Sequence, residues 1–251
     1  MKPMHCNRFL RAVLRAMLFP LVCAAALALT ACKTITGSGP MKTEEYSPSA
    51  FTALSQELAA QVTLEEGETH AVRIHTYENL LPHIEVTVDG DRLRIRTDRN
   101  LRADPPIEVT VVAPRIQSVS IMGSATVGGT ATLRGESISA RISGSGRIEL
   151  PVEAAETDAA ISGSGRIHLT GTAETVRARI SGSGRIHTDG IHARDAVADI
   201  SGSGVIYVHA SQTLRARVSG SGRITFEGGA VPDVTISGSG SVRPADRDPT
   251  S

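Results

Sequence analysis

One four-residue peptide, Ser-Gly-Ser-Gly, recurs six times in the second half of this 251-residue chain. Its copies begin 19, 19, 20, 18 and 18 residues apart, at Ser143, Ser162, Ser181, Ser201, Ser219 and Ser237. A period held this closely indicates that one supersecondary unit is stacked repeatedly. The repeat therefore determines the architecture of the second half, and it favours an extended surface over a catalytic pocket.

Apolar residues alternate with polar ones on both sides of each copy. The inward positions before the glycines are Ile142, Ile161, Ile180, Ile200, Val218 and Ile236, and those after them are Ile148, Ile167, Ile186, Ile206, Ile224 and Val242. One coil cannot enclose a core, but stacked coils can, because each strand pairs with its equivalent about 4.8 Å away. The pattern predicts an all-β fold, a right-handed parallel β-solenoid (β-helix) of 18–20-residue coils with two short strands each and an N-terminal β-rich portion.

The glycines of the repeat are predicted to form structural corners. A sharp corner requires positive φ at some positions, which glycine adopts without strain. The corner residues are Gly144, Gly146, Gly163, Gly165, Gly182, Gly184, Gly202, Gly204, Gly220, Gly222, Gly238 and Gly240. Residues 121–125 resemble a degenerate first copy.

Residues 49–117 form the N-terminal β portion, ahead of the repeats at 118–243. Apolar residues alternate over 84–88 and 93–96, on either side of Asp89-Gly90, which is a strong hairpin signal. Residues 32–48 are polar and are predicted to form a tether, and residues 244–251 a polar tail.

The first 31 residues have the features of a secretory leader. Four basic residues precede an apolar run over 16–29, and Leu29-Thr30-Ala31 stands before Cys32. Small residues before a cysteine resemble the lipobox of bacterial lipoproteins, in which that cysteine is lipidated after cleavage. The alternatives are an ordinary signal peptide with an incidental cysteine and a transmembrane helix, for which the apolar run is short. We expect lipidation at Cys32, hence a membrane partner, and Lys33 favours the outer membrane.

Composition excludes several functions. Without the leader, the chain has 22 basic and 26 acidic residues, so no concentrated basic field is available for nucleic acid. The chain lacks tryptophan and has few aromatic residues, which disfavours a lectin or glycosidase. The Gly-Ser-Gly peptides match neither a phosphate-binding loop nor a Gly-x-Ser-x-Gly nucleophile motif. We expect no catalytic residue, no cofactor and no metal.

Beyond these residue-level arguments, the chain resembles a known family. The leader, Gly37-Ser38-Gly39, Thr43-Glu44-Glu45, Phe51-Thr52-Ala53, the peptide at residues 78–84 and the repeats are similar to the bacterial "putative auto-transporter adhesin, head GIN domain" family. The resemblance covers residues 37–242. It implies an all-β, solenoid-like fold and a location in the cell envelope, and it carries over no catalytic residue.

Three sets of outward residues bear on binding. Arg147, Arg166, Arg185 and Arg223 share one position, broken by Val205; they form either a solvated face or a ladder for an anionic polymer such as surface polysaccharide. Glu149, His168 and His187 share a second column, which is a mixed surface or, less simply, a zinc site. Opposite charges at Arg179/Asp199/Arg217, Asp158/Arg177 and Arg215/Asp233 are predicted to pair between coils and to hold the register.

These observations predict a non-enzymatic, lipid-anchored cell-envelope protein that presents a rigid solenoid for adhesion or binding. Its partners would be anionic surface polysaccharide or an envelope protein. Two alternatives stay open, a periplasmic scaffold and an enzyme that acts on polysaccharide.

Overall fold

The computed structural model describes residues 34–245, which lie within one compact unit. The predicted leader, Cys32 and residues 246–251 of the predicted tail lie outside the described residues. The described chain is almost entirely β, with one short 3₁₀ helix, and its parallel coils stack as a solenoid of about seven turns. The predicted fold class is confirmed.

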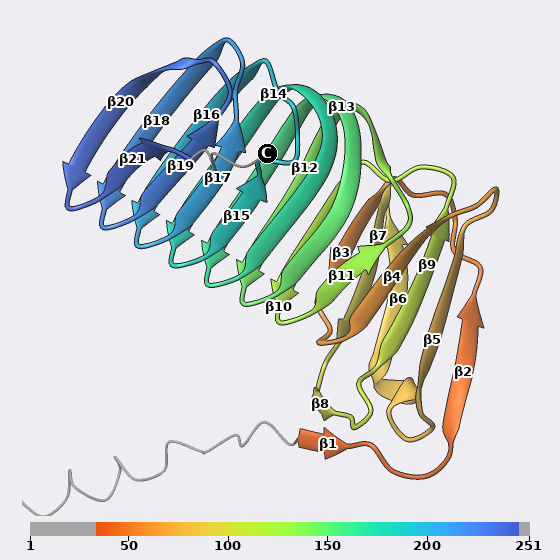
Figure 1. Cartoon of the computed structure of the whole chain (residues 1–251). Coiled ribbons are helices and arrows are strands. Elements are labelled where there is room, and N and C mark those ends of the chain that lie inside the picture. Colours follow the sequence, from red (N-terminus) through yellow and green to blue (C-terminus); the bar gives the residue numbers. More distant parts are fainter. Residues whose placement is uncertain (1–33, 246–251) are drawn as a thin grey trace, which may run out of the picture. The chain divides into compact units, whose positions relative to one another are not determined.

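The repeat region forms the stack of parallel coils in Figure 1. Two residues that are equivalent in the repeat pair in register, for example Ile142 with Ile161 and Ile161 with Ile180. Two coils depart from the expected pair of short strands, because β13 and β14 each continue as one bent strand from one glycine corner to the next. The strands are β10 (Ser118–Gly123), β11 (Thr126–Gly129), β12 (Leu133–Gly144), β13 (Arg147–Gly163), β14 (Arg166–Gly182), β15 (Arg185–Thr188), β16 (Asp195–Gly202), β17 (Val205–His209), β18 (Thr213–Gly220), β19 (Arg223–Glu227), β20 (Val231–Gly238) and β21 (Ser241–Pro244).

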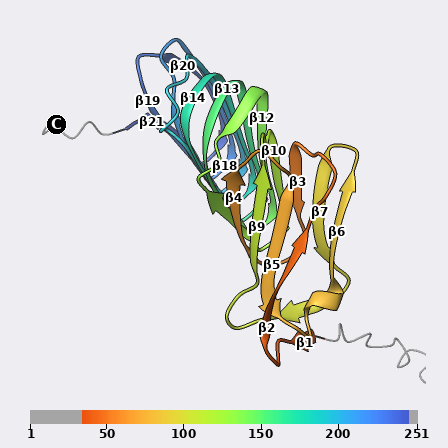
Figure 2. The ribbon, with the colours of Figure 1, turned by 90° about the vertical axis from the view of Figure 1, so that its right-hand side faces the viewer.

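The N-terminal strands continue the same stack. β3 and β4 pair in parallel with β10 and β11, and β7 and β9 then pair in parallel with β3 and β4, so parallel stacking crosses residue 118. Antiparallel strands close this end: β6 pairs with β7 in the predicted hairpin, β5 with β9, and β2 with β5 (Figure 2). The elements are β1 (Thr34–Thr36), β2 (Met41–Tyr46), β3 (Ala53–Gln56), β4 (Gln61–Glu66), β5 (Ala71–Tyr77), η1 (Leu81–His83), β6 (Ile84–Asp89), β7 (Arg92–Thr97), β8 (Asn100–Arg102) and β9 (Glu108–Ala113).

Residues 34–46, predicted to lie in a tether, form β1 and β2 instead. β1 pairs with β8, and β2 covers the free edge of β5 along its whole length. The prediction missed β2 because this edge strand turns most of its side chains to solvent and so carries almost no apolar residues. Polar composition alone therefore did not distinguish an edge strand from a linker.

The core consists of the predicted inward columns. Ile142, Ile161, Ile180, Ile200 and Val218 are each 2% exposed, and the column after the corner is fully buried from Ile148 to Ile224. Burying a side chain of this kind stabilises the fold by about 1.5–3 kcal/mol. The last coil is the exception: Ile236 is expected inside but is 43% exposed, because no further coil among residues 34–245 covers it.

The two glycines of a corner are required for different reasons. Gly182 has a φ of 125°, and a Cβ there would lie 2.5 Å from the carbonyl oxygen of Gly163 in the preceding coil. Gly184 has an ordinary φ, but a Cβ on it would lie 2.7 Å from the Cγ2 of Ile161. The first glycine therefore allows the turn, and the second allows the coils to approach.

Candidate functional site

Every glycine corner lies on the same edge of the solenoid, and two outward surfaces flank this edge. The backbone hydrogen bonds between coils continue through the corner: the N–H of Ser164 donates to Gly144 O at 2.9 Å, and that of Ser183 donates to Gly163 O at 2.9 Å. Because these backbone hydrogen bonds are not interrupted at the corner, equivalent side chains on both sides of it are separated by the same distance from coil to coil. Each coil thus repeats its outward groups about 4.8 Å from the last.

The four predicted ladder arginines do stand in one column. Register pairs join Arg147 with Arg166 and Arg166 with Arg185. The column then passes through Val205 to Arg223. Three consecutive arginines therefore project from neighbouring coils on the face that follows the corner. We define Arg147, Arg166 and Arg185 as the arginine ladder.

The arginine ladder lacks the carboxylates that would neutralise it. Arg147 has one exposed partner, Glu149, with Nη1 and Oε1 3.4 Å apart. Within residues 34–245, Arg166, Arg185 and Arg223 make no ion pair. Neighbouring guanidinium groups at this spacing repel one another, so an added anion would relieve that repulsion.

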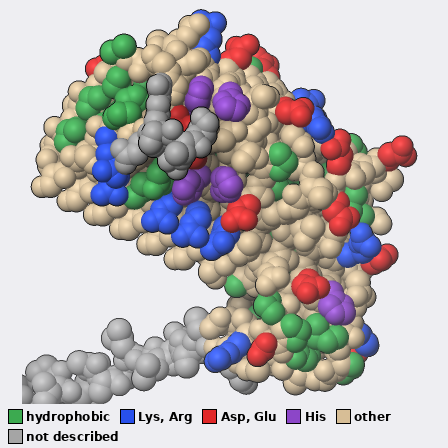
Figure 3. All heavy atoms as spheres, in the orientation of Figure 1, with side chains coloured by type: hydrophobic (Ala, Val, Ile, Leu, Met, Phe, Trp, Pro, Cys, Tyr) green, Lys and Arg blue, Asp and Glu red, His purple; other side chains and the backbone are tan. Residues whose placement is uncertain are grey.

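A polar trough of about 380 Å³ runs along the arginine ladder. Its other wall is a column of corner serines: Ser145, Ser164, Ser183 and Ser203. Basic side chains gather beside histidines on this face, over β15 and β17 (Figure 3). Guanidinium and hydroxyl groups are donors suited to carboxylate, sulfate and sugar hydroxyl groups. These serines are absent from the predicted binding residues. Each lies three residues after an inward isoleucine, however, and an odd spacing places a side chain on the opposite, outward side of an extended chain.

The second outward column beside the ladder is a stack of rings. The rings of His187 and Tyr207 are stacked, with centroids 4.4 Å apart and planes 8° apart, and His168 meets His187 edge to face at 5.8 Å. Burial lowers the pKa of His187, and Asp189 opposes this shift while His168 and Arg185 reinforce it. Within residues 34–245 no three His, Cys, Asp or Glu side chains are placed to hold a metal ion. The column therefore supplies flat ring surface next to the guanidinium groups.

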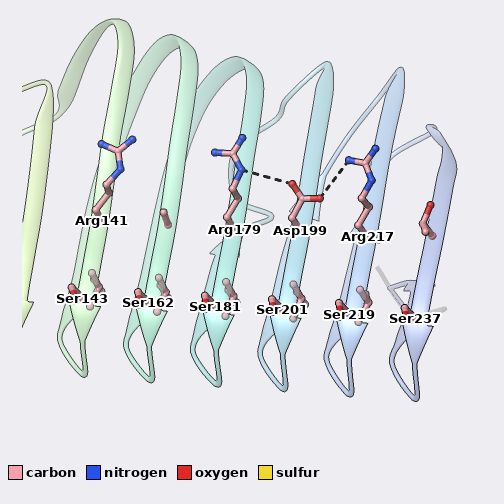
Figure 4. A pocket seen from close by; sticks show the side chains of 17 residues that line it. Arg141, Ser143, Ser162, Arg179, Ser181, Asp199, Ser201, Arg217, Ser219 and Ser237 are labelled. Carbon is pink, nitrogen blue, oxygen red and sulfur yellow. Dashed lines mark ion pairs between the residues drawn. The ribbon is translucent and has the colours of Figure 1, made fainter.

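On the face on the other side of the corner, the arginines are paired with carboxylates. Figure 4 shows Asp199 between two of them, 3.7 Å from Arg179 and 3.7 Å from Arg217. These pairs, and Arg215 with Asp233 at 3.5 Å, occur as predicted. A shallow trough of about 670 Å³ lies between these side chains and the column of serines that begins at Ser143.

One predicted ion pair is wrong. Asp158 and Arg177 are register partners, but Asp158 instead pairs diagonally with Arg141 at 2.5 Å and with Arg179 at 3.0 Å. Ala160 stands between these two arginines in their column, and its small side chain lets both lean toward Asp158. Arg177 pairs with a carboxylate of the preceding coil, that of Glu156 (2.6 Å).

The membrane attachment site predicted at Cys32 falls outside the described residues. In the described part of the chain, no helix has the length and apolar character needed to span a bilayer. The structure thus leaves the role of Cys32 as a prediction from the sequence.

Comparison with known proteins identifies relatives of the whole described fold. Residues 50–230 match a family model described as "Putative auto-transporter adhesin, head GIN domain". A putative adhesin from Bacteroides fragilis superposes with a TM-score of 0.78 at 20% identity, covering 84% of this chain and 99% of that one. A putative lipid binding protein from Parabacteroides distasonis gives 0.70 at 22% identity, with coverages of 84% and 99%. A putative adhesin from Parabacteroides merdae gives 0.68 at 21%, with coverages of 84% and 98%. No match was found among curated proteins. The structural likenesses show a shared fold.

Proposed function

Because the chain belongs to the putative auto-transporter adhesin, head GIN domain family, we propose that it is a non-enzymatic binding protein of the bacterial cell envelope. In this proposal the protein is lipid-anchored through Cys32, and its rigid solenoid presents the arginine ladder to an anionic polysaccharide. An adhesin-like family is consistent with an envelope or surface location.

The observation that carries the proposal is the contrast between the two faces of the corner. On one face, every arginine of the column forms an ion pair with Asp158 or Asp199: these are Arg141, Arg179 and Arg217. Arg166 and Arg185 stand in an equally regular column, yet no carboxylate of residues 34–245 pairs with them. The same fold thus accommodates an arginine column whose members are all ion-paired, so an unpaired column is not a requirement of stacking.

The spacing of the ladder suits a linear polymer. One guanidinium group projects per coil, about every 4.8 Å, and extended acidic polysaccharides carry charges at similarly regular intervals. Guanidinium groups form bidentate hydrogen bonds with carboxylate and sulfate groups. The corner serines and the Tyr207 ring lie beside the ladder, where hydroxyl groups and sugar rings of such a chain would pass.

Binding can be tested with the processed protein and three commercial polymers. Polygalacturonate and dextran sulfate are the anionic probes, and uncharged dextran is the neutral probe, measured by isothermal titration calorimetry at low and physiological salt. We expect binding to both anionic probes that weakens as salt increases, and none to dextran. Arg166→Glu and Arg185→Glu should each weaken binding at least about tenfold, which corresponds to roughly 1.4 kcal/mol.

Arg194→Glu is the matched control, because Arg194 is an exposed arginine of the same solenoid that is absent from the ladder. It makes the same change in net charge. If Arg194→Glu and Arg185→Glu weaken binding equally, binding depends only on net charge, and the proposed role of the arginine ladder is wrong. If the protein binds neither anionic polymer, the proposal that its ligand is an anionic polysaccharide is wrong.

The location is tested by protease treatment of intact cells, with Cys32→Ala as the control for anchoring. A lipid-anchored protein on the cell surface would be digested in intact cells, and the Cys32→Ala chain would be released from the membrane fraction. Protection until the outer membrane is opened would reject adhesion and favour the periplasmic scaffold.

A further inference from the structure

The last coil of the solenoid leaves core positions uncovered. In β18, one coil earlier, Ala216 is fully buried and Val218 is 2% exposed, whereas their register partners in β20 are open to solvent, with Val234 42% and Ile236 43% exposed. Hydrophobic side chains gather at this end of the molecule in Figure 3. An apolar end of this kind is what interior coils present to their neighbours, and so it is complementary to another coil.

The same end also has two open strand edges. Among the described residues, β20 pairs only with β18, and β21 only with β19. Unpaired backbone groups along an edge strand are a template for pairing with another strand. The end coil is thus able to accept both apolar contacts and backbone hydrogen bonds.

At the other end of the stack the apolar core is covered, which makes the exposed apolar end distinctive. There β6 and β2 add antiparallel strands, and the residue before η1, Leu80, is fully buried. Solenoid proteins generally need a terminal unit with a polar outer face at each end.

We propose that a second copy of this chain covers the end coil, so that two solenoids join end to end about a twofold axis. A twofold axis that lies across the end face makes the facing strands antiparallel, so their backbone groups can pair directly. Such an interface is isologous and closes after two copies. Because the N-terminal end differs, head-to-tail stacking does not follow, and the product is a dimer instead of a fibre.

Charge on the two end strands supports the choice of a second copy. Asp233 on β20 has a side chain that is 74% exposed, and Arg243 on β21 is also exposed. When β20 of one copy lies against β21 of the other, Asp233 and Arg243 carry opposite charges along the same edge, twice per dimer. These pairs would set the orientation, while Val234 and Ile236 supply the buried contact.

Sedimentation velocity of the full chain in detergent, over a wide range of protein concentration, tests the dimer. We expect a reversible monomer–dimer equilibrium that Val234→Lys and Ile236→Lys each weaken at least about tenfold. Thr172→Lys, which adds the same charge at an exposed position in the middle of the stack, should leave the equilibrium unchanged. Circular dichroism checks that each variant is folded, as expected for substitutions at partly exposed positions.

A second pair of variants addresses the orientation. Arg243→Asp should weaken the dimer, and adding Asp233→Arg should restore it. A chain that stays monomeric at every concentration overturns the proposal, and so does a dimer that both lysine variants leave intact. If the chain dimerises only after residues 246–251 are deleted, the chain's own C-terminus covers the end coil and the proposal is wrong.

Discussion

Substitution of Gly182 by alanine should damage the stack more than its single added methyl group suggests. Gly182 has a φ of 125°, a conformation that residues with a side chain rarely adopt. An alanine Cβ would also lie 2.5 Å from the carbonyl oxygen of Gly163, which is backbone of the preceding coil and cannot move aside as a side chain could. Both costs act at once, because relieving the clash would open the spacing between coils.

The expected magnitude follows from adding the two costs. A non-glycine residue held in a sparsely populated backbone region costs about 1–3 kcal/mol. Forcing additional volume into a packed site costs about 1–3 kcal/mol more. We therefore expect Gly182→Ala to lower the free energy of unfolding by roughly 2–6 kcal/mol, a large part of the stability of an ordinary domain.

Urea unfolding followed by far-ultraviolet circular dichroism measures this effect, since the chain has no tryptophan to report by fluorescence. Gly229→Ala is the matched control, because Gly229 has no positive φ and the nearest atom to a Cβ there is Ser211 O at 3.6 Å. The control should change the free energy of unfolding by less than about 0.5 kcal/mol. Equal effects of the two substitutions, or a negligible effect of Gly182→Ala, would refute the account of the corner.

Two further predictions concern charge. Asp199→Arg places three arginines in adjacent coils where Asp199 now lies between Arg179 and Arg217, so it should lower the free energy of unfolding by about 1 kcal/mol. Added salt should shrink that loss if its origin is electrostatic, and an unchanged melting temperature at low salt would contradict it. The pKa of His187 is lowered by burial below the value of about 6.5 in the unfolded chain, so the unfolded state binds a proton first as the pH falls. Stability should therefore decline below about pH 6.5, and His187→Gln should decline less over the same pH range in thermal unfolding experiments; an identical decline would rule out His187 as the source.

The sequence was sufficient to predict the repeating coils because their determinants are local and recur six times. A period of 18–20 residues, alternating isoleucines and paired glycines all require the same stack, so errors at one position are corrected by the others. The columns that contain Ile142 and Ile148 are buried as predicted. In the last coil, Ile236 is exposed and Val242 only half-buried, because a neighbouring coil is missing there among the described residues, and no single strand encodes its neighbour.

The parts that sequence reasoning missed depend on which neighbour a segment meets. β2 has almost no apolar side chains, and its identity as a strand comes from the open edge of β5 that it covers. Asp158 likewise had a predicted partner by register, but the choice among nearby arginines was decided by the small size of Ala160 between them. Register specifies which backbones are adjacent, whereas the reach of a long side chain selects among several partners.

A structural column and a binding column of this solenoid differ in whether the protein itself supplies partners for their charges. A parallel stack places equivalent residues of successive coils at a fixed spacing. A charged residue that recurs in the repeat therefore lies next to a like charge, unless another column supplies the opposite charge. Before the corner, Asp158 and Asp199 do so, and each arginine of that column has a carboxylate partner. After the corner, Arg166 and Arg185 have no such partner among residues 34–245, and the neighbouring column offers rings and hydroxyl groups. Neutralisation of this second column must come from solution ions or from a ligand, and the regular polyanion that we propose would supply one negative charge per coil.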